Sequence, residues 1–136
     1  MNRITLITLG VADLARSTGF YVRLGWTPED GPPSVAFFGM RGFYFGLYGL
    51  EALAEEQGRT ADALGRGASS LSVNFPDRAA VDAAYADATE AGAQPLRPPG
   101  EVHWSGYTSY WSDPDGHVWE YAHNPFWPLD KDGWIA

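Results

Sequence analysis

The residue best placed to carry out chemistry is Glu120, in the last predicted strand, residues 117–123. Side chains alternate between the two faces of a strand, so His117 and His123, an odd number of residues from Glu120, lie on the opposite face. His103 falls in a predicted loop and is the one imidazole able to approach the carboxylate. Three interpretations of Glu120 follow: a hydrogen bond to a neighbouring hydroxyl, pairing with a cationic group of a ligand, or proton abstraction.

Polar and aromatic side chains are expected on the same face as Glu120. Alternation along the predicted strands selects them, with Ser112 taken to pair with His117 across the last turn. The predicted ligand-binding set comprises Ser70, Ser72, Asn74, Tyr44, Tyr48, Tyr107, Trp111 and Glu120. His103 and Trp104 join it from a loop flanked by proline and glycine, which suits either a lid or an ordinary exposed loop with a packed tryptophan. This mixture is typical of a small-molecule pocket, although single aromatics would equally suit packing against the tail or a partner subunit.

The elements that must position these residues begin with a strand–helix–hairpin unit in the first half of the chain. Residues 3–11 form an apolar, β-branched run that predicts a strand, and Asp13 follows as a helix N-cap. A short strand is expected near residues 26–29, and residues 34–50 predict a hairpin.

The second half repeats this order. Residues 69–75 predict a strand, and Asp77 caps a helix that ends before Gly92. A short strand near residues 94–96 precedes a loop over 97–103, and the closing hairpin turns at the sequence DPDG.

The register of the repeat is regular. Asp77 follows Asp13 by 64 residues, and Tyr85 follows Tyr21 by the same number. The predicted fold class is α+β: two βαβββ modules forming a curved mixed sheet around an open cup, with helices on the outer face. We expect a single domain over residues 1–136. Its parts are module one at about 1–50, a linker at about 51–66, module two at about 67–123 and an aromatic tail at 124–136.

Composition excludes several classes of function. Nine basic and seventeen acidic side chains give a net charge of −8, which repels phosphate backbones and argues against nucleic-acid binding. Without cysteine, disulfides, thiolate nucleophiles and cysteine-ligated metals are excluded. No signal-like or membrane-length apolar run is visible, so we expect a cytoplasmic protein without membrane contact.

Two segments resemble the vicinal-oxygen-chelate superfamily, the glyoxalase, bleomycin-resistance and extradiol-dioxygenase group. GVADLARSTGFYVRLGW is similar to the first strand–helix unit of that superfamily, and GYTSYWSDPDGHVWEYAHNP is similar to its closing hairpin. The resemblance implies paired βαβββ modules, often in a homodimer, and in catalytic members a divalent metal in the cup.

The resemblance also indicates where metal ligands would stand. The four positions fall on Leu6, Gly46, Ser70 and Glu120. Leucine and glycine side chains offer no lone pair, and a neutral serine is a poor ligand for zinc, iron or nickel. We therefore expect no metal and no other cofactor.

These observations favour a protein that sequesters an aromatic or polycyclic small molecule, as bleomycin-resistance-like members of the superfamily do. The alternative is a glyoxalase-like lyase or isomerase, either metal-dependent or metal-free with Glu120 as the base. Whether the chain is an enzyme stays open, with Glu120 its one catalytic candidate. A third possibility is an accessory dimer whose aromatic surface contacts protein.

Overall fold

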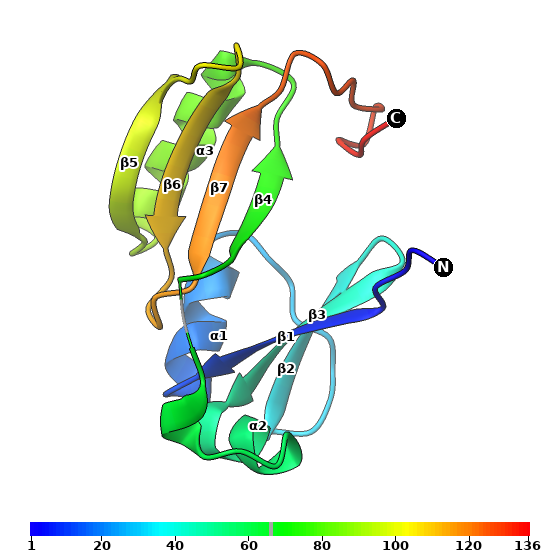
Figure 1. The fold of residues 1–136 in the computed structure, drawn as a ribbon, viewed down its shortest axis with the longest axis vertical. Coiled ribbons are helices and arrows are strands. Elements are labelled where there is room, and N and C mark those ends of the chain that lie inside the picture. The colour runs from blue at the N-terminus through cyan, green and yellow to red at the C-terminus, as the bar shows by residue number, and fades with distance from the viewer. Residues whose placement is uncertain (66) are drawn as a thin grey trace. The chain divides into compact units, whose positions relative to one another are not determined.

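The chain folds into two units, Met1–Arg66 (unit 1) and Gly67–Ala136 (unit 2), each a sheet with helix packed on it (Figure 1). The structure is a computed structural model that describes residues 1–65 and 67–136. Arg66, the last residue of the predicted linker, lies outside the described residues. Each unit has the element order of a βαβββ-like module, which confirms the predicted α+β fold class.

Unit 1 contains a three-stranded sheet in the order β1-β3-β2. Strand β1 (Leu6–Val11) runs parallel to β3 (Phe43–Gly49), which pairs antiparallel with β2 (Val35–Met40). A parallel pair needs a long crossover, and the helix between β1 and β2 forms part of it.

Helix α1 (Leu14–Arg23) covers one face of this sheet. It begins after Asp13, whose side chain accepts a hydrogen bond from the Arg16 amide at 3.0 Å, so the predicted N-cap is confirmed. Tyr21 is fully buried, with its ring centroid 5.4 Å from that of Phe45 and 6.0 Å from that of Phe38. Aromatic packing of this kind makes the core of unit 1.

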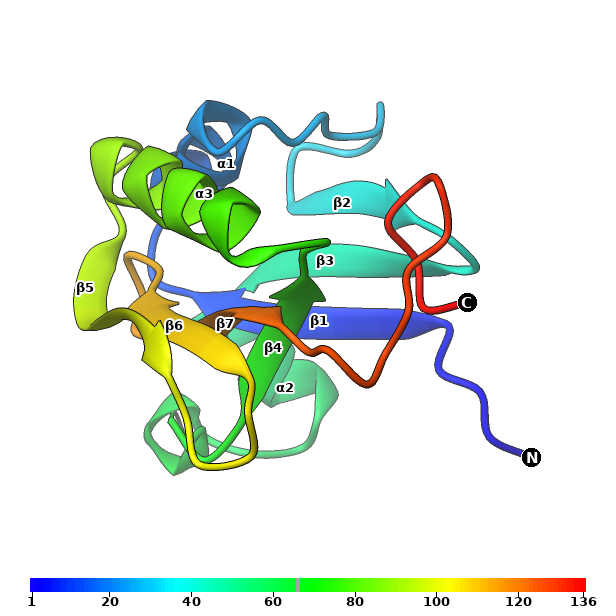
Figure 2. The ribbon, with the colours of Figure 1, turned by 90° about the horizontal axis from the view of Figure 1, so that it is seen from above.

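The segment after β3 returns to the sheet. Helix α2 (Leu50–Glu56) packs beside Gly10, and a short 3₁₀ helix, η1 (Ala61–Ala63), follows. A Cβ atom at Gly10 would lie 2.8 Å from Cδ2 of Leu50 and 3.1 Å from Cδ2 of Leu53. Figure 2 shows α1 and α2 on opposite sides of the sheet, so part of the face opposite α1 is covered.

Unit 2 contains a four-stranded sheet in the order β4-β7-β6-β5. Strand β4 (Ser70–Asn74) runs parallel to β7 (Val118–His123), which pairs antiparallel with β6 (Tyr107–Ser112). Strand β5 (Gln94–Glu101) forms the edge beside β6.

Helix α3 (Arg78–Glu90) lies along one face of the unit 2 sheet in both ribbon views (Figures 1 and 2). Asp77 caps it, accepting a hydrogen bond from the Ala80 amide at 2.8 Å, as predicted. Trp111 and Trp119 stack beneath the helix with ring centroids 5.6 Å apart and planes 10° apart. The core of unit 2 therefore lies between the sheet and α3.

The strand pairing bears out the predicted repeat. Thr8 in β1 pairs with Gly46 in β3, and Ser72 in β4 pairs with Glu120 in β7. Strands β1, β3 and β2 in unit 1 thus correspond to β4, β7 and β6 in unit 2.

Two predicted strands differ from the structure. The strand expected near residues 26–29 is reduced to a single bridge between Pro28 and Phe38, because proline has no amide to continue a ladder. The loop expected over 97–103 is instead largely strand, since β5 runs to Glu101. Its prolines are tolerated because β5 is an edge strand, and register shifts interrupt its pairing with β6.

The tail after β7 folds into a small hairpin. Leu129 and Ile135 form an antiparallel bridge, and the Ala136 amide donates to the Pro128 carbonyl at 2.9 Å. The Asp130 carboxylate accepts from the amides of Asp132 and Trp134. Its own hydrogen bonds therefore order the tail.

Candidate functional site

Glu120 lies at the centre of a hydrogen-bonded group on unit 2. Its strand neighbours on either side are Ser72 in β4 and Tyr110 in β6. The Ser72 hydroxyl donates to Oε1 of Glu120 at 2.8 Å, and the Tyr110 hydroxyl donates to Oε2 at 2.6 Å. Both carboxylate oxygens are thus held by hydroxyl groups from adjacent strands, which aligns the carboxylate with the sheet.

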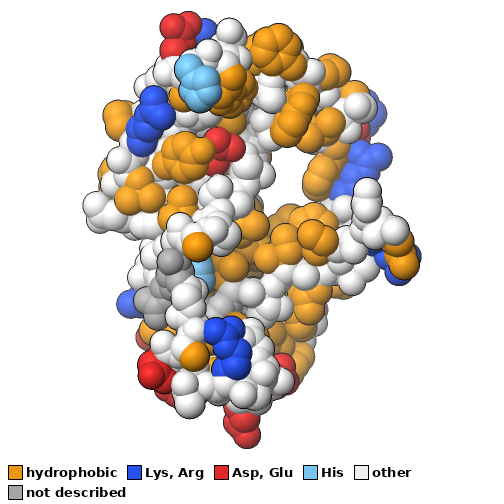
Figure 3. Space-filling view, in the orientation of Figure 1, with side chains coloured by type: hydrophobic (Ala, Val, Ile, Leu, Met, Phe, Trp, Pro, Cys, Tyr) orange, Lys and Arg blue, Asp and Glu red, His pale blue; other side chains and the backbone are white. Residues whose placement is uncertain are grey.

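This group lies on the face of the unit 2 sheet that points away from α3, which we call the Glu120 face. Ser70 and Asn74 share this face, because they pair with Val118 and Ala122 in β7. Ser70 and Ser72 are exposed, and Glu120 is half-buried. Figure 3, in the orientation of Figure 1, shows hydrophobic side chains with polar and charged ones between them on this side of unit 2.

The electrostatics of the group keep Tyr110 protonated. The hydrogen bond to Glu120, followed by burial and the charge of the carboxylate, raises the pKa of Tyr110 to about 12. Arg97, paired with Tyr110 across β5 and β6, acts in the opposite direction and lowers it. At neutral pH the phenol therefore acts as a donor to the carboxylate.

Tyr110 is absent from the predicted site because the predicted register of the last hairpin is wrong by one residue. The Asp113 amide donates to the His117 carbonyl at 2.9 Å, so Ser112 pairs with Val118. The loop has three residues, and Gly116 takes a φ of 84°, a conformation typical of this hairpin class. A shift of one residue exchanges the two faces of a strand.

Tyr107 and Trp111 consequently lie on the α3 side. The Tyr107 hydroxyl donates to Asp82 of α3 at 2.7 Å, and Trp111 is fully buried against Trp119. The prediction that these two side chains share a face with Glu120 is wrong. The glycine at the last position of the turn was the signal that could have indicated the shorter loop.

His103 and Trp104 occupy a tight turn between β5 and β6. The Val102 amide donates to the Gly106 carbonyl, and the Ser105 amide to the Val102 carbonyl, each at 3.0 Å. The Trp104 ring lies so close to Gly106 that any Cβ there would overlap it. His103 and Trp104 therefore lie at a hairpin tip, where Trp104 packs against Gly106, and their role as a lid stays a prediction.

Tyr44 and Tyr48 belong to unit 1. Tyr44 is half exposed beside the Phe37 ring, with centroids 6.0 Å apart. The Tyr48 hydroxyl donates to Glu56 of α2 at 3.3 Å, and this carboxylate raises the pKa of Tyr48. Tyr48 therefore links α2 to β3, the central strand of the sheet.

The donor set does not fit a divalent metal. At Gly46 the Phe37 ring covers the backbone, with Cε1 3.1 Å from where a Cβ would stand. Leu6 offers no lone pair and the neutral hydroxyl of Ser70 is a poor metal ligand, which leaves the single carboxylate of Glu120. No group of three or more His, Cys, Asp or Glu side chains within residues 1–65 and 67–136 is arranged to hold an ion.

The repeated module and its closing hairpin correspond to a known family. The model of the Glyoxalase/Bleomycin resistance protein/Dioxygenase superfamily matches residues 3–121. The chain belongs to this superfamily. The resemblance inferred from the two sequence segments is confirmed.

Solved structures of the superfamily share the fold over nearly the whole chain. A glyoxalase-related enzyme from Fulvimarina pelagi is 34% identical, covers 100% of this chain and 98% of its own, and has a TM-score of 0.90. A glyoxalase/bleomycin resistance protein/dioxygenase from Nocardioides is 27% identical, with coverages of 90% and 83% and a TM-score of 0.75. A lactoylglutathione lyase from Agrobacterium tumefaciens, 18% identical with a TM-score of 0.73 and coverages of 96% and 99%, shares the fold.

A comparison with curated protein sequences gave no match. Among the helices that the structure describes, none has the length and apolar character required to span a membrane.

Proposed function

We propose that this superfamily member binds a small aromatic or polycyclic molecule without a metal, using the Glu120 face of unit 2. The observation that carries the proposal is the Ser72–Glu120–Tyr110 group, in which two hydroxyl donors hold one carboxylate at the centre of the sheet. A carboxylate fixed in this way is preorganised to receive a ligand.

The group favours a ligand that donates to the carboxylate. Each carboxylate oxygen has two lone-pair sites and uses one for its hydroxyl partner, so one site on each oxygen is left for an N–H or a cationic group. The Tyr110 ring adds a flat surface on which an aromatic ligand can stack. The net charge of −8 also favours neutral or cationic ligands over anions.

Proflavine, a planar aromatic cation, tests this proposal directly. We expect saturable binding that weakens by about 10-fold to 100-fold in Glu120→Gln, because a hydrogen bond to a charged group contributes about 1.5–3 kcal/mol. Fluorescence titration measures the affinity. Glu90→Gln, an exposed carboxylate at the end of α3, removes the same charge away from the face and is the matched control.

Equal weakening in Glu120→Gln and Glu90→Gln would show that only net charge attracts the dye, and would count against a site at Glu120. Tyr110→Phe provides a second arm. It keeps the ring and removes the donor, so we expect an affinity loss smaller than that of Glu120→Gln.

Metal content gives an independent test. Elemental mass spectrometry after exposure to nickel, zinc, iron, manganese and cobalt, followed by desalting, should find far less than one metal per chain. About one equivalent per chain that disappears in Glu120→Ala would overturn the metal-free proposal.

One observation favours a second candidate, a metal-free lyase or isomerase. The 2.6 Å hydrogen bond between Tyr110 and Glu120 couples a carboxylate base to a phenol, an arrangement that can accept and return a proton. Turnover of a glyoxalase-type substrate by the protein alone, abolished in Glu120→Gln with the fold intact, would favour this enzyme over the binder.

A further inference from the structure

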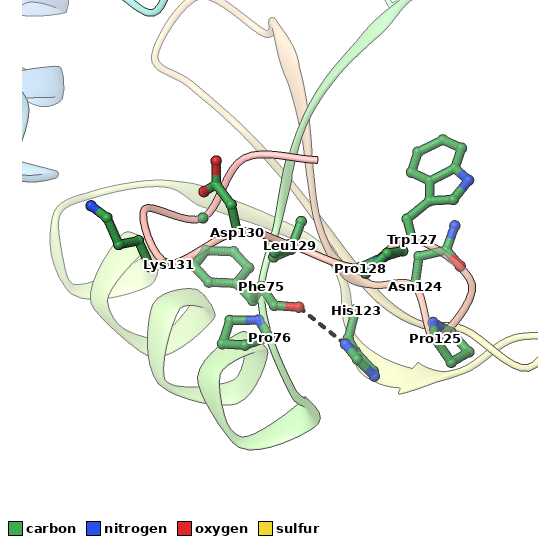
Figure 4. Close-up of a pocket in the computed structure, with 11 residues that line it drawn as sticks. Phe75, Pro76, His123, Asn124, Pro125, Trp127, Pro128, Leu129, Asp130 and Lys131 are labelled. Carbon is green, nitrogen blue, oxygen red and sulfur yellow. Dashed lines mark hydrogen bonds between the residues drawn. The ribbon is translucent and has the colours of Figure 1, made fainter. Parts of the chain in front are cut away.

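The tail hairpin borders an open cavity in unit 2. Its volume is about 390 Å³, within the range of small-molecule sites. It is lined by apolar side chains that follow β4 and β7 or belong to the tail, among them Phe75, Pro76, Pro128 and Leu129 (Figure 4). Ser72, Tyr110 and Glu120 are not among its lining residues, so we name it separately, as the tail cavity.

The uncharged polar side chains that line this cavity are the imidazole of His123 and the amide of Asn124, whose Oδ1 accepts from the Phe126 amide at 2.9 Å. His123 lines it, and its Nδ1 lies 3.0 Å from the carbonyl oxygen of Phe75. A carbonyl only accepts hydrogen bonds, so Nδ1 must carry the proton. In the neutral ring the other nitrogen, Nε2, is then an acceptor, and no contact within the described residues occupies it.

The charged side chains of the tail do not serve the cavity. In Figure 4 the carboxylate of Asp130 and the ammonium of Lys131 point away from the Phe75 ring. The Asp130 carboxylate accepts from tail amides, and Lys131 pairs with its neighbour Asp132 at 2.9 Å. An ionic ligand therefore finds no opposite charge directed at it.

We propose that the tail cavity binds a neutral molecule of one or two aromatic rings that donates a single N–H or O–H to Nε2 of His123. Phe75 packs edge-on against Tyr121, with centroids 5.0 Å apart, so its ring is held in place as a wall of the site. The tail wall is ordered by its own bridge and by the Asp130 hydrogen bonds. Such preorganisation lowers the entropic cost of binding.

Indole and benzofuran are matched probes for this site, because they have nearly the same shape and only indole carries an N–H donor. The full chain is titrated with each probe and followed by backbone amide NMR. We expect saturable shifts at the amides of Phe75, His123 and Lys131, with a Kd for indole on the order of 1 mM. Benzofuran should bind about 5-fold to 10-fold more weakly, the factor that one net hydrogen bond contributes.

His123→Phe keeps a ring and removes the acceptor, so the preference for indole should fall to about one. If that variant does not fold, the wild-type protein still tests the proposal. The NMR resonance of His123 Nε2 should shift when indole is added and stay in place when benzofuran is added. Glu90→Gln, at an exposed carboxylate away from both sites, is the control, and its indole affinity should equal that of the wild type. Linear, non-saturating shifts, equal affinities for the two probes, or shifts centred on Ser72 and Glu120 would each overturn the proposal.

Discussion

Tyr110 shows how one residue connects the site to stability. Its pKa is raised to about 12, first by the hydrogen bond it donates to Glu120 and then by burial. A raised pKa means that the folded state binds this proton more tightly than the unfolded state, whose tyrosines titrate near 10. Tyr110 therefore contributes stability that is fully present below about pH 10 and is lost as pH rises through about 12.

We accordingly expect the free energy of unfolding to fall between pH 9 and pH 11.5, and to fall less in Tyr110→Phe. Urea denaturation at the two pH values measures the difference. Tyr121→Phe is the comparison. Burial raises the pKa of Tyr121 as well, so this substitution should also reduce the pH dependence of the unfolding free energy, separately from Tyr110→Phe. An unchanged pH dependence in Tyr110→Phe would show that its hydrogen bond to Glu120 does not form in solution.

At the scale of the element, the packing of α2 depends on a glycine in β1. Gly10 is buried, and a Cβ there would stand 2.8 Å from Leu50 and 3.1 Å from Leu53. Real Cβ atoms essentially never come as close as 2.8 Å, so Gly10→Ala must displace the Leu50 side chain and also shift Leu53 slightly. We expect a loss of about 1–3 kcal/mol, the usual cost of overpacking, measured by denaturant unfolding.

Gly19→Ala is the matched control. Gly19 lies inside α1, where its Cβ would meet only the end of the Arg23 side chain at 3.4 Å. Alanine is a better helix former than glycine, so this substitution should stabilise the protein by about 0.5–1 kcal/mol. Equal effects of the two substitutions would contradict the close packing of α2 on β1.

At the scale of the whole molecule, the tail exposes an unusual amount of aromatic surface. Its four exposed large hydrophobic side chains are Phe126, Trp127, Trp134 and Ile135. Large aromatics of this kind are typical of protein interfaces, and we expect a homodimer.

The mass of one chain is 14.9 kDa, so light scattering on a sizing column should give twice that value. Trp127→Ala should lower the measured mass toward that of a single chain, because the exposed indole then no longer contributes to the interface. Trp104→Ala, at a comparably exposed tryptophan on the β5–β6 turn, should leave the mass unchanged. A single-chain mass for the wild type would contradict the expected dimer.

Local signals predicted most of the fold. The two capping aspartates, the β-branched runs and the repeat register act over a few residues, and the structure confirms the order of elements they indicate. The reduction of residues 26–29 to a single bridge and the extension of β5 to Glu101 were not predictable in this way. Whether a proline-containing segment joins a sheet depends on whether it is an edge strand.

The sequence by itself determined the family, the repeated module and the position of Glu120 on its strand. Hydrophobic periodicity and turn-forming residues act over a few neighbouring positions, so they can be recognised without the tertiary structure. Only the tertiary structure decided which neighbours surround that carboxylate. The register of one hairpin placed Tyr110 against Glu120 and put Tyr107 and Trp111 on the α3 side, where Tyr107 bonds to Asp82 and Trp111 is buried. The tail cavity likewise exists only because residues far apart in the chain, Phe75 and Leu129, come together on folding. Strand side chains have a period of two, so a single residue of register, which turn geometry sets, exchanges every side chain between site and core.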